Sequence, residues 1–227
     1  MSFEAGSAYN EKLIPILRGD ALPSPHDPVE HITYDLWNNM RACDHDLAND
    51  VLEPVFTVMR AQTDKARVGI KDLGAYLEYR ERDVGQALLS ALMRFVRKLN
   101  LSTEESELIR DMDKNCSKHI SVINDIFSWE KELMKSMVGH KEGSVLCSSV
   151  QVMAATANIS IDAAKRVLWM ICREWEACHE QMMPSRQCIS RDLVIYCSGL
   201  ENLMSGNELW SKSTKRYHDL GTQAGGL

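Results

Sequence analysis

The sequence lacks any apolar run that approaches the ~18 residues needed for a membrane-spanning helix. Its first ten residues, MSFEAGSAYN, also lack a basic region followed by an apolar one, which is the pattern of a secretory signal peptide. The sequence therefore predicts no membrane span and no signal for export.

Paired-cysteine motifs are missing as well, because none of the seven cysteines forms a C-x-x-C pair. An odd number of cysteines in a chain of this length favours free, mostly buried thiols rather than a disulfide framework. We therefore expect a reducing compartment, the cytoplasm. The positions are Cys43, Cys116, Cys147, Cys172, Cys178, Cys188 and Cys197.

An excess of positive charge is also absent. The formal net charge is -6, whereas a nucleic-acid-binding protein generally carries a basic stripe or patch. The charge balance argues against nucleic acid as a partner, although it is compatible with a local basic pocket.

Strand patterns are missing too, since no β-branched run alternates with period two. Apolar residues instead recur at spacings of three and four, which predicts helices. With 227 residues, 44% of them hydrophobic, the chain can bury one substantial core. We predict an all-α helical bundle, with one domain over residues 1–218 and a flexible, Gly-rich tail over 219–227.

The predicted helices follow from this spacing and from local start and stop signals. Ser102 and Glu105 form a capping-box pattern that should begin the helix running into residues 124–132. Ser160 resembles the N-cap of a later helix. The other helices are expected over residues 10–18, 29–59, 71–99, 145–158 and 190–217. Pro15 should disturb the first of these and Pro54 should kink the second. The Gly139–Gly143 stretch should end the long helix that carries residues 124–132.

The segment Asn124–Glu132, NDIFSWEKE, carries the chemistry. Asn124, Ser128 and Glu132 are spaced i, i+4 and i+8, so on a helix their side chains share one face. An amide oxygen, a hydroxyl and a carboxylate are hard ligands of the kind Mg²⁺ or Mn²⁺ accepts beside water and phosphate. Lys131 is placed to put a positive charge beside a bound diphosphate. From spacing alone, an ordinary solvated helix face with a Glu-Lys pattern is the favoured interpretation.

The same segment resembles the second metal motif of class I terpene synthases, Asn/Asp-Asp-x-x-Ser/Thr-x-x-x-Glu, with every fixed position filled. From about Ser2 to Tyr217 the chain is similar to fungal sesquiterpene cyclases of that family. The stretches that carry the resemblance are GSAYNEKLIPILRGDALP, YDLWNNMRACD, EPVFTVMRAQTD, GAYLEYRERDVG, NCSKHISVINDIFSWEKE and MSGNELWSKSTKRY. The resemblance implies a class I terpenoid synthase helical bundle and Mg²⁺-dependent ionisation of farnesyl diphosphate, followed by carbocation cyclisation.

The resemblance also implies roles for individual residues. Those implied to ligate Mg²⁺ are Asn124, Ser128 and Glu132, and those implied to bind diphosphate are Arg80, Lys131, Arg216 and Tyr217. Without the family, Arg80 would be interpreted as a surface charge. Trp210 is placed to stabilise a carbocation by cation–π attraction, with a core tryptophan as the alternative. The family also allows a homodimer. His119 has no partner at ligand spacing in the sequence, and we assign it no role.

One motif of the family is missing from these residues, namely the aspartate-rich D-D-x-x-D/E sequence. In the family, the stretch resembling SFEAGSAYNEK follows that motif, so Met1 corresponds to an internal methionine. We therefore expect a truncated cyclase that binds the metal–diphosphate cluster weakly and has low or no activity. The alternatives are a non-enzymatic relative that binds diphosphate or a partner, and a prenyl-chain-elongating enzyme, which Asn124 and Ser128 match poorly.

Overall fold

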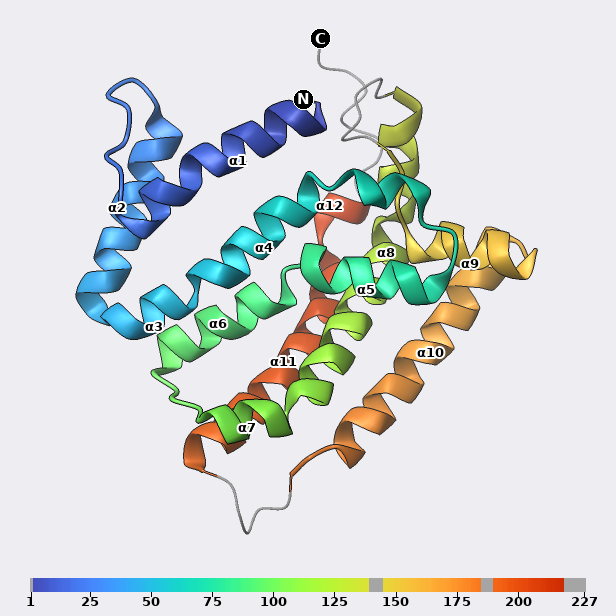
Figure 1. The fold of residues 1–227 in the computed structure, drawn as a ribbon. Helices are drawn as coiled ribbons and strands as arrows, with labels where there is room; N and C mark the ends of the chain where they lie inside the picture. Colours follow the sequence, from blue (N-terminus) through green and yellow to red (C-terminus); the bar gives the residue numbers. More distant parts are fainter. Residues whose placement is uncertain (1, 139–144, 185–189, 219–227) are drawn as a thin grey trace.

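The computed structural model describes residues 2–138, 145–184 and 190–218, and in these ranges the chain is helical without a strand (Figure 1). The all-α prediction is confirmed. The expected break at Gly139–Gly143 and the predicted tail over 219–227 lie outside the described residues. The elements are α1 (Phe3–Arg18), α2 (Pro28–Cys43), α3 (His45–Asp50), α4 (Leu52–Gln62), the 3-10 helix η1 (Lys65–Gly69), α5 (Leu73–Asp83), α6 (Gln86–Arg97), α7 (Thr103–Leu108), α8 (Arg110–Val138), α9 (Ser149–Ala157), α10 (Ile161–Gln181), α11 (Arg191–Ser213) and α12 (Lys215–His218).

The N-terminal helices differ from the prediction in where they break. The run predicted over 29–59 is three helices, because Asp44 is extended and its side chain caps α3 by accepting from the Leu47 backbone N–H. Pro54 causes no kink. It lies in the first turn of α4, where a backbone N–H has no partner within the helix. Helix α1 begins earlier than predicted and continues through Pro15.

The helix predicted over 71–99 is two helices, α5 and α6, and the prediction of a single helix is wrong. Gly85, between them, has φ +79°, a conformation that glycine adopts at little cost and other residues rarely adopt. The break lets α5 pack against α8 while α6 packs between α4 and α11.

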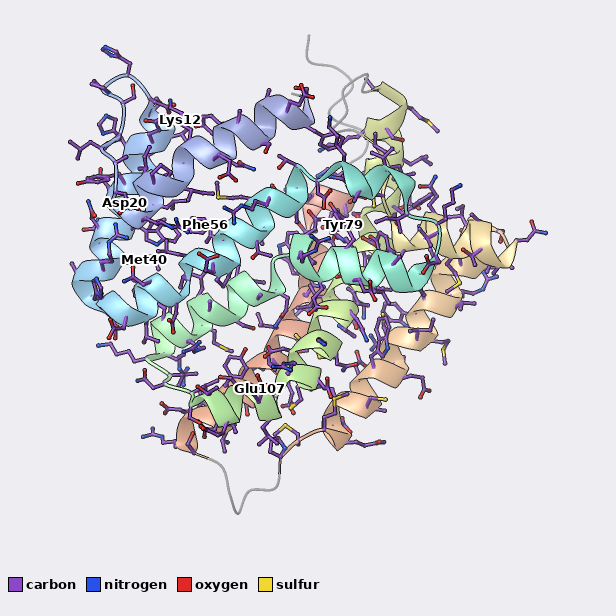
Figure 2. The ribbon with its side chains drawn as sticks, viewed as in Figure 1. Lys12, Asp20, Met40, Phe56, Tyr79 and Glu107 are labelled. Carbon is purple, nitrogen blue, oxygen red and sulfur yellow. The ribbon has the colours of Figure 1, made fainter. Side chains whose placement is uncertain are left out.

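Helix α8, which carries the predicted metal motif, is packed from two sides (Figure 1). Cys116 and Ile120 belong to a buried cluster that includes Leu200 of α11. Val122 and Ile123 belong to another buried cluster, which joins α8 to α9 and α10. A third buried cluster joins α1, α2, α4 and α6, and includes Met40 and Phe56, labelled in Figure 2. Helix α8 is thus fixed by the core, and its remaining face is turned toward α5 and α12.

The predicted capping box is present at the start of α7. The Ser102 hydroxyl accepts from the Glu105 backbone N–H, and the Glu105 carboxylate accepts from the Ser102 backbone N–H. The predicted single helix nevertheless breaks at Ile109, so α8 begins at Arg110.

Replacing Ser102 with alanine should lower the free energy of unfolding by about 1 kcal/mol, because the cap hydrogen bond to the Glu105 N–H is lost. Urea denaturation measures the change. Thr103→Ala is the neighbouring control and should have less than half the effect. Equal effects of the two substitutions would show that the cap contributes nothing specific.

The cysteines in the described ranges are all free, as expected. Cys116, Cys172 and Cys197 are buried, whereas Cys43 and Cys178 are exposed. Burial raises the pKa of the Cys172 thiol to about 12 and that of Cys197 to about 11, so these two thiols stay protonated at neutral pH. Across the same ranges, no helix has the length and apolar character required to cross a bilayer.

Candidate functional site

The predicted metal ligands lie on one face of α8. Within this face the Ser128 hydroxyl, which is buried, donates to a Glu132 carboxylate oxygen over 2.7 Å. Asn124 lies one turn earlier and contacts both α5 and α12 through hydrogen bonds from Arg80 and to Tyr217. The shared face expected from the i, i+4, i+8 spacing is therefore present, and it is a contact surface rather than a solvated one.

Asp125 anchors this part of α8 to its surroundings. Its side chain has no exposed surface, and its carboxylate accepts from the Tyr76 hydroxyl at 2.5 Å, the Ser149 backbone N–H at 2.8 Å and Arg80 at 3.2 Å. The donors come from α5 and from the start of α9. A buried carboxylate with three donors joins three helices around the site.

Arg80 is not a surface charge, because its side chain is only 13% exposed. Its guanidinium donates to the Asn124 side-chain oxygen at 3.3 Å, to Asp125, and to Asp83 one turn later on α5. Its position is therefore set by two acidic partners, while it contacts one of the predicted metal ligands directly.

Tyr217 brings the C-terminal residues to α8. Helix α11 ends at Ser213, Thr214 is extended, and the short α12 follows, so the helix predicted over 190–217 is broken at this point. The Tyr217 hydroxyl accepts from the Asn124 amide over 2.7 Å. The Lys131 ammonium and the Arg216 guanidinium lie 6.0 and 5.9 Å from the Tyr217 ring centre.

Trp210 is 45% exposed, so the alternative of a core tryptophan is wrong. Its ring packs edge-on against the Tyr217 ring, with 5.4 Å between the centroids. The aromatic pair therefore lies beside Lys131 and Arg216, the two cations predicted to bind diphosphate.

Lys131 and Arg216 add positive charge to this site. Among the described residues, neither Lys131 nor Arg216 forms an ion pair. Burial, followed by the charges of Arg216 and Lys135, lowers the pKa of Lys131. An anion placed among these side chains would relieve that repulsion, since opposite charge favours the protonated lysine.

The donor set suits a magnesium ion. Asn124, Ser128 and Glu132 offer an amide oxygen, a hydroxyl and a carboxylate, and Mg²⁺ takes oxygen ligands and is commonly completed by water and substrate phosphate. The existing hydrogen bond between Ser128 and Glu132 shows that two of these oxygens already lie within 2.7 Å of each other. The side chains present therefore fit the ion.

Two residues of the site were missed by sequence reasoning, Asp125 and Tyr76. Asp125 occupies a fixed position of the motif but was given no role. Tyr76 precedes Arg80 by one turn of α5, so both reach Asp125 from one helix face. The i, i+4 spacing of Tyr76 and Arg80 was the only sign in the sequence that these two side chains share a helix face.

The pH dependence of stability tests the environment of Glu132. Burial, followed by the charge of Asp125, raises the pKa of Glu132. The folded state then binds this proton more tightly than the unfolded state does, so the contribution of Glu132 to stability falls as the pH rises from about 4 toward 7. Relative to wild type without metal, Glu132→Gln should become more stable as the pH rises. Urea denaturation at several pH values measures this, and parallel curves for the two proteins would contradict it.

The sequence of this chain is similar to those of known proteins. Residues 3–177 match the family model "Terpene synthase family 2, C-terminal metal binding". The chain is 56% identical to aristolochene synthase of Aspergillus terreus over 220 residues, covering 96% of this chain and 69% of that protein. It is 56% identical to (+)-aristolochene synthase of Penicillium expansum over 223 residues, covering 97% of this chain and 67% of that one. The chain thus spans about two thirds of the length of these relatives.

The fold is similar to a solved structure as well. The crystal structure of aristolochene synthase from Penicillium roqueforti superposes with a TM-score of 0.81 at 51% sequence identity. The match covers 95% of this chain and 72% of that one.

Proposed function

The chain belongs to the terpene synthase family, and we propose that it binds Mg²⁺ together with the diphosphate of farnesyl diphosphate and promotes loss of that group in a sesquiterpene cyclase reaction. The observation that carries the proposal is the Asn124–Tyr217 hydrogen bond. It joins the oxygen ligands of α8 to the C-terminal cations in one site.

In this proposal, Asn124, Ser128 and Glu132 hold the metal ion, and Arg80, Lys131, Arg216 and Tyr217 bind the diphosphate. The bound Mg²⁺ would supply Lewis-acid stabilisation of charge on the departing diphosphate. Arginine suits phosphate because its planar guanidinium presents several donors at once. Lys131 and Arg216 add positive charge where negative charge grows as the carbon–oxygen bond breaks.

Asp125 has a supporting role in the same proposal. It orients Arg80 through its carboxylate while Tyr76 and Ser149 fix the carboxylate itself. Trp210 offers an aromatic face to the carbocation left after ionisation, since cation–π attraction stabilises positive charge beside an indole ring.

We expect turnover by the 227-residue chain to be slow, because the aspartate-rich motif is not among its residues and fewer carboxylates then hold the metal–diphosphate cluster. The second candidate is a relative that binds diphosphate without cyclising a substrate. Lys131 and Arg216 beside Tyr217 favour it, because diphosphate binding alone requires only such groups.

Incubation of the purified chain with farnesyl diphosphate and Mg²⁺ distinguishes the two, with volatile hydrocarbons identified by mass spectrometry. The proposal predicts a cyclic sesquiterpene, of the aristolochene type by similarity, that disappears in the Asn124→Ala/Glu132→Ala variant. Magnesium-dependent binding of pyrophosphate without any hydrocarbon would favour the second candidate. A folded chain that neither binds pyrophosphate nor forms product would contradict both.

We further propose that residues 1–218 act as one catalytic domain, that the chain resides in the cytoplasm and that it associates as a homodimer. Light scattering after size-exclusion chromatography tests the dimer directly, because it gives the molar mass in solution.

A further inference from the structure

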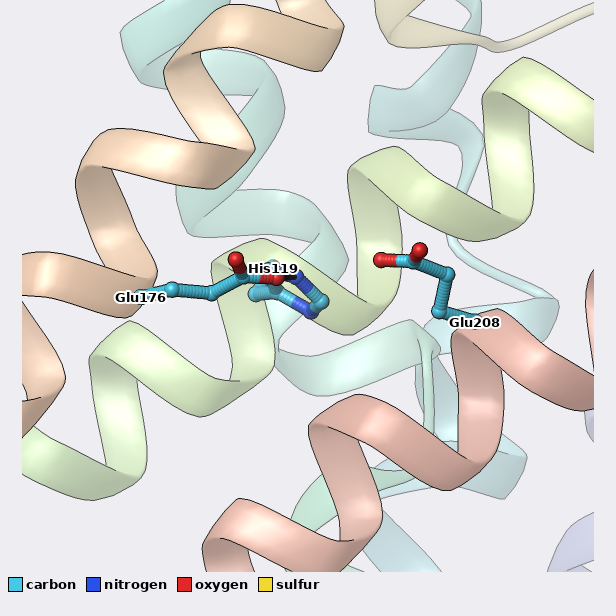
Figure 3. Close-up of side chains that lie close together, drawn as sticks. All are labelled: His119, Glu176 and Glu208. Atoms are coloured by element: carbon cyan, nitrogen blue, oxygen red, sulfur yellow. Dashed lines mark hydrogen bonds and ion pairs between the residues drawn. The ribbon is translucent and has the colours of Figure 1, made fainter.

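A cluster of ligating side chains lies on the opposite side of α8 from the diphosphate site. His119 precedes Asn124 by five residues, which turns its side chain about 140° around the helix axis. It has no exposed surface, and its Nε2 lies 2.8 Å from a carboxylate oxygen of Glu176 on α10. Glu208 of α11 approaches from the other side (Figure 3). The spacing of residues in the sequence does not predict this set, because each residue comes from a different helix.

The three side chains lie at nearly the separation that a metal ion needs. One ligand atom from each residue lies within 4.8 Å of the others. Ligands at about 2.1 Å from a tetrahedral ion are about 3.4 Å apart. Metal binding therefore requires the Glu176 and Glu208 side chains to rotate closer to His119. Binding through His119 Nε2 leaves the ring proton on Nδ1.

The cluster borders a cavity of about 660 Å³ between α10 and α11 whose charge favours a cation. Four lining residues are glutamates, Glu176, Glu180, Glu201 and Glu208, whereas the basic ones are Arg173 and Lys212. His179 also lines the cavity and is only 2% exposed, and its Nε2 has no hydrogen-bond partner among the described residues. An unpartnered imidazole nitrogen at an acidic cavity is an independent sign of a polar ligand.

In this structure the positively charged group at the cluster is the Arg173 guanidinium. Its guanidinium pairs with Glu176 at 2.8 Å and with Glu208, and it stacks over the Trp169 ring at 4.5 Å. Lys212 also pairs with Glu208, at 2.5 Å. A metal ion at the three ligands would have to displace Arg173 from the carboxylates, while the stacking on Trp169 could persist.

We propose that His119, Glu176 and Glu208 form a second metal site, which takes a borderline divalent ion such as Zn²⁺ or Co²⁺ in competition with Arg173. An imidazole with two carboxylates suits these ions better than Mg²⁺, which prefers oxygen ligands alone. Two carboxylates balance the two positive charges of such an ion, and the His119 and Glu208 side chains are largely buried. The proposal does not depend on catalysis by the diphosphate site.

Titration with Co²⁺ tests the proposal, because its visible absorption reports the type of ligand. The background is Cys43→Ser/Cys178→Ser/Cys188→Ser, which removes thiols that would bind the ion elsewhere. We expect one Co²⁺ per chain, a spectrum without thiolate absorption, and no displacement by excess Mg²⁺. Arg173→Met should tighten binding about tenfold, and Glu208→Gln should weaken it at least about tenfold.

Glu180→Gln is the matched control, since Glu180 lines the same cavity but lies outside the cluster. It should leave the affinity within about twofold. Circular dichroism establishes that each variant is folded. The proposal is overturned if the folded Arg173→Met protein binds no stoichiometric Co²⁺, or if Glu208→Gln and Glu180→Gln change the affinity equally.

Discussion

Replacing Asp125 with alanine should lower the free energy of unfolding by about 3–5 kcal/mol, the cost of removing one partner of a buried charge pair. The substitution leaves the Tyr76 hydroxyl, the Ser149 N–H and one Arg80 donor without their acceptor in a fully buried position. Buried donors that lose their acceptor bear a desolvation cost. Urea denaturation measures the loss.

Asp125→Asn and Asp162→Ala are the controls for this prediction. The asparagine keeps the size and one acceptor oxygen, so we expect a smaller loss. Asp162 is an exposed residue in the first turn of α10, and its removal should cost less than about 1 kcal/mol. If Asp125→Ala and Asp162→Ala destabilised the protein equally, Asp125 would not anchor the site.

Asn124→Ala should reduce magnesium-dependent affinity for inorganic pyrophosphate by at least about 100-fold. The substitution removes a proposed metal ligand and, at the same time, the hydrogen-bond partner of both Arg80 and Tyr217. Loss of a supporting contact alone typically costs 10–100-fold in metal affinity, and here a ligand is lost as well. Isothermal titration calorimetry with pyrophosphate, with and without Mg²⁺, measures the effect.

Asn202→Ala makes the same chemical change at an exposed position of α11, and it should leave the affinity unchanged. Tyr217→Phe separates the two roles of Asn124, since it removes the hydroxyl but keeps the proposed ligand. We expect it to lose less affinity than Asn124→Ala. A smaller loss for Asn124→Ala than for Tyr217→Phe would argue against metal ligation by Asn124.

Regular spacing made the helices and the shared face of Asn124, Ser128 and Glu132 predictable. The spacing of apolar residues along a helix is a local property of the sequence, so it does not depend on how the helices pack together. Helix breaks were harder to place. Gly85 and Thr214 interrupt runs whose apolar pattern continues across them, and the break at Thr214 is the one that turns Tyr217 toward Asn124.

The unpredicted parts of the site depend on contacts between helices far apart in the sequence. Asp125 lies in the motif beside Asn124, but its hydrogen-bond partners, Tyr76, Arg80 and the start of α9, are distant in the sequence. His119 likewise acquires its carboxylate neighbours only when α10 and α11 pack on α8. Spacing within one helix shows which side chains share a face, but it does not identify the helix that packs against that face.

Anomalous diffraction from crystals soaked with Mn²⁺ and pyrophosphate tests the central claim most directly, because it locates the ion itself. We predict a manganese peak within bonding distance of the side-chain oxygens of Asn124, Ser128 and Glu132, with pyrophosphate between it and Arg80, Lys131, Arg216 and Tyr217. Bound pyrophosphate without a metal peak at those oxygens, or manganese bound only at His119, Glu176 and Glu208, would contradict the account.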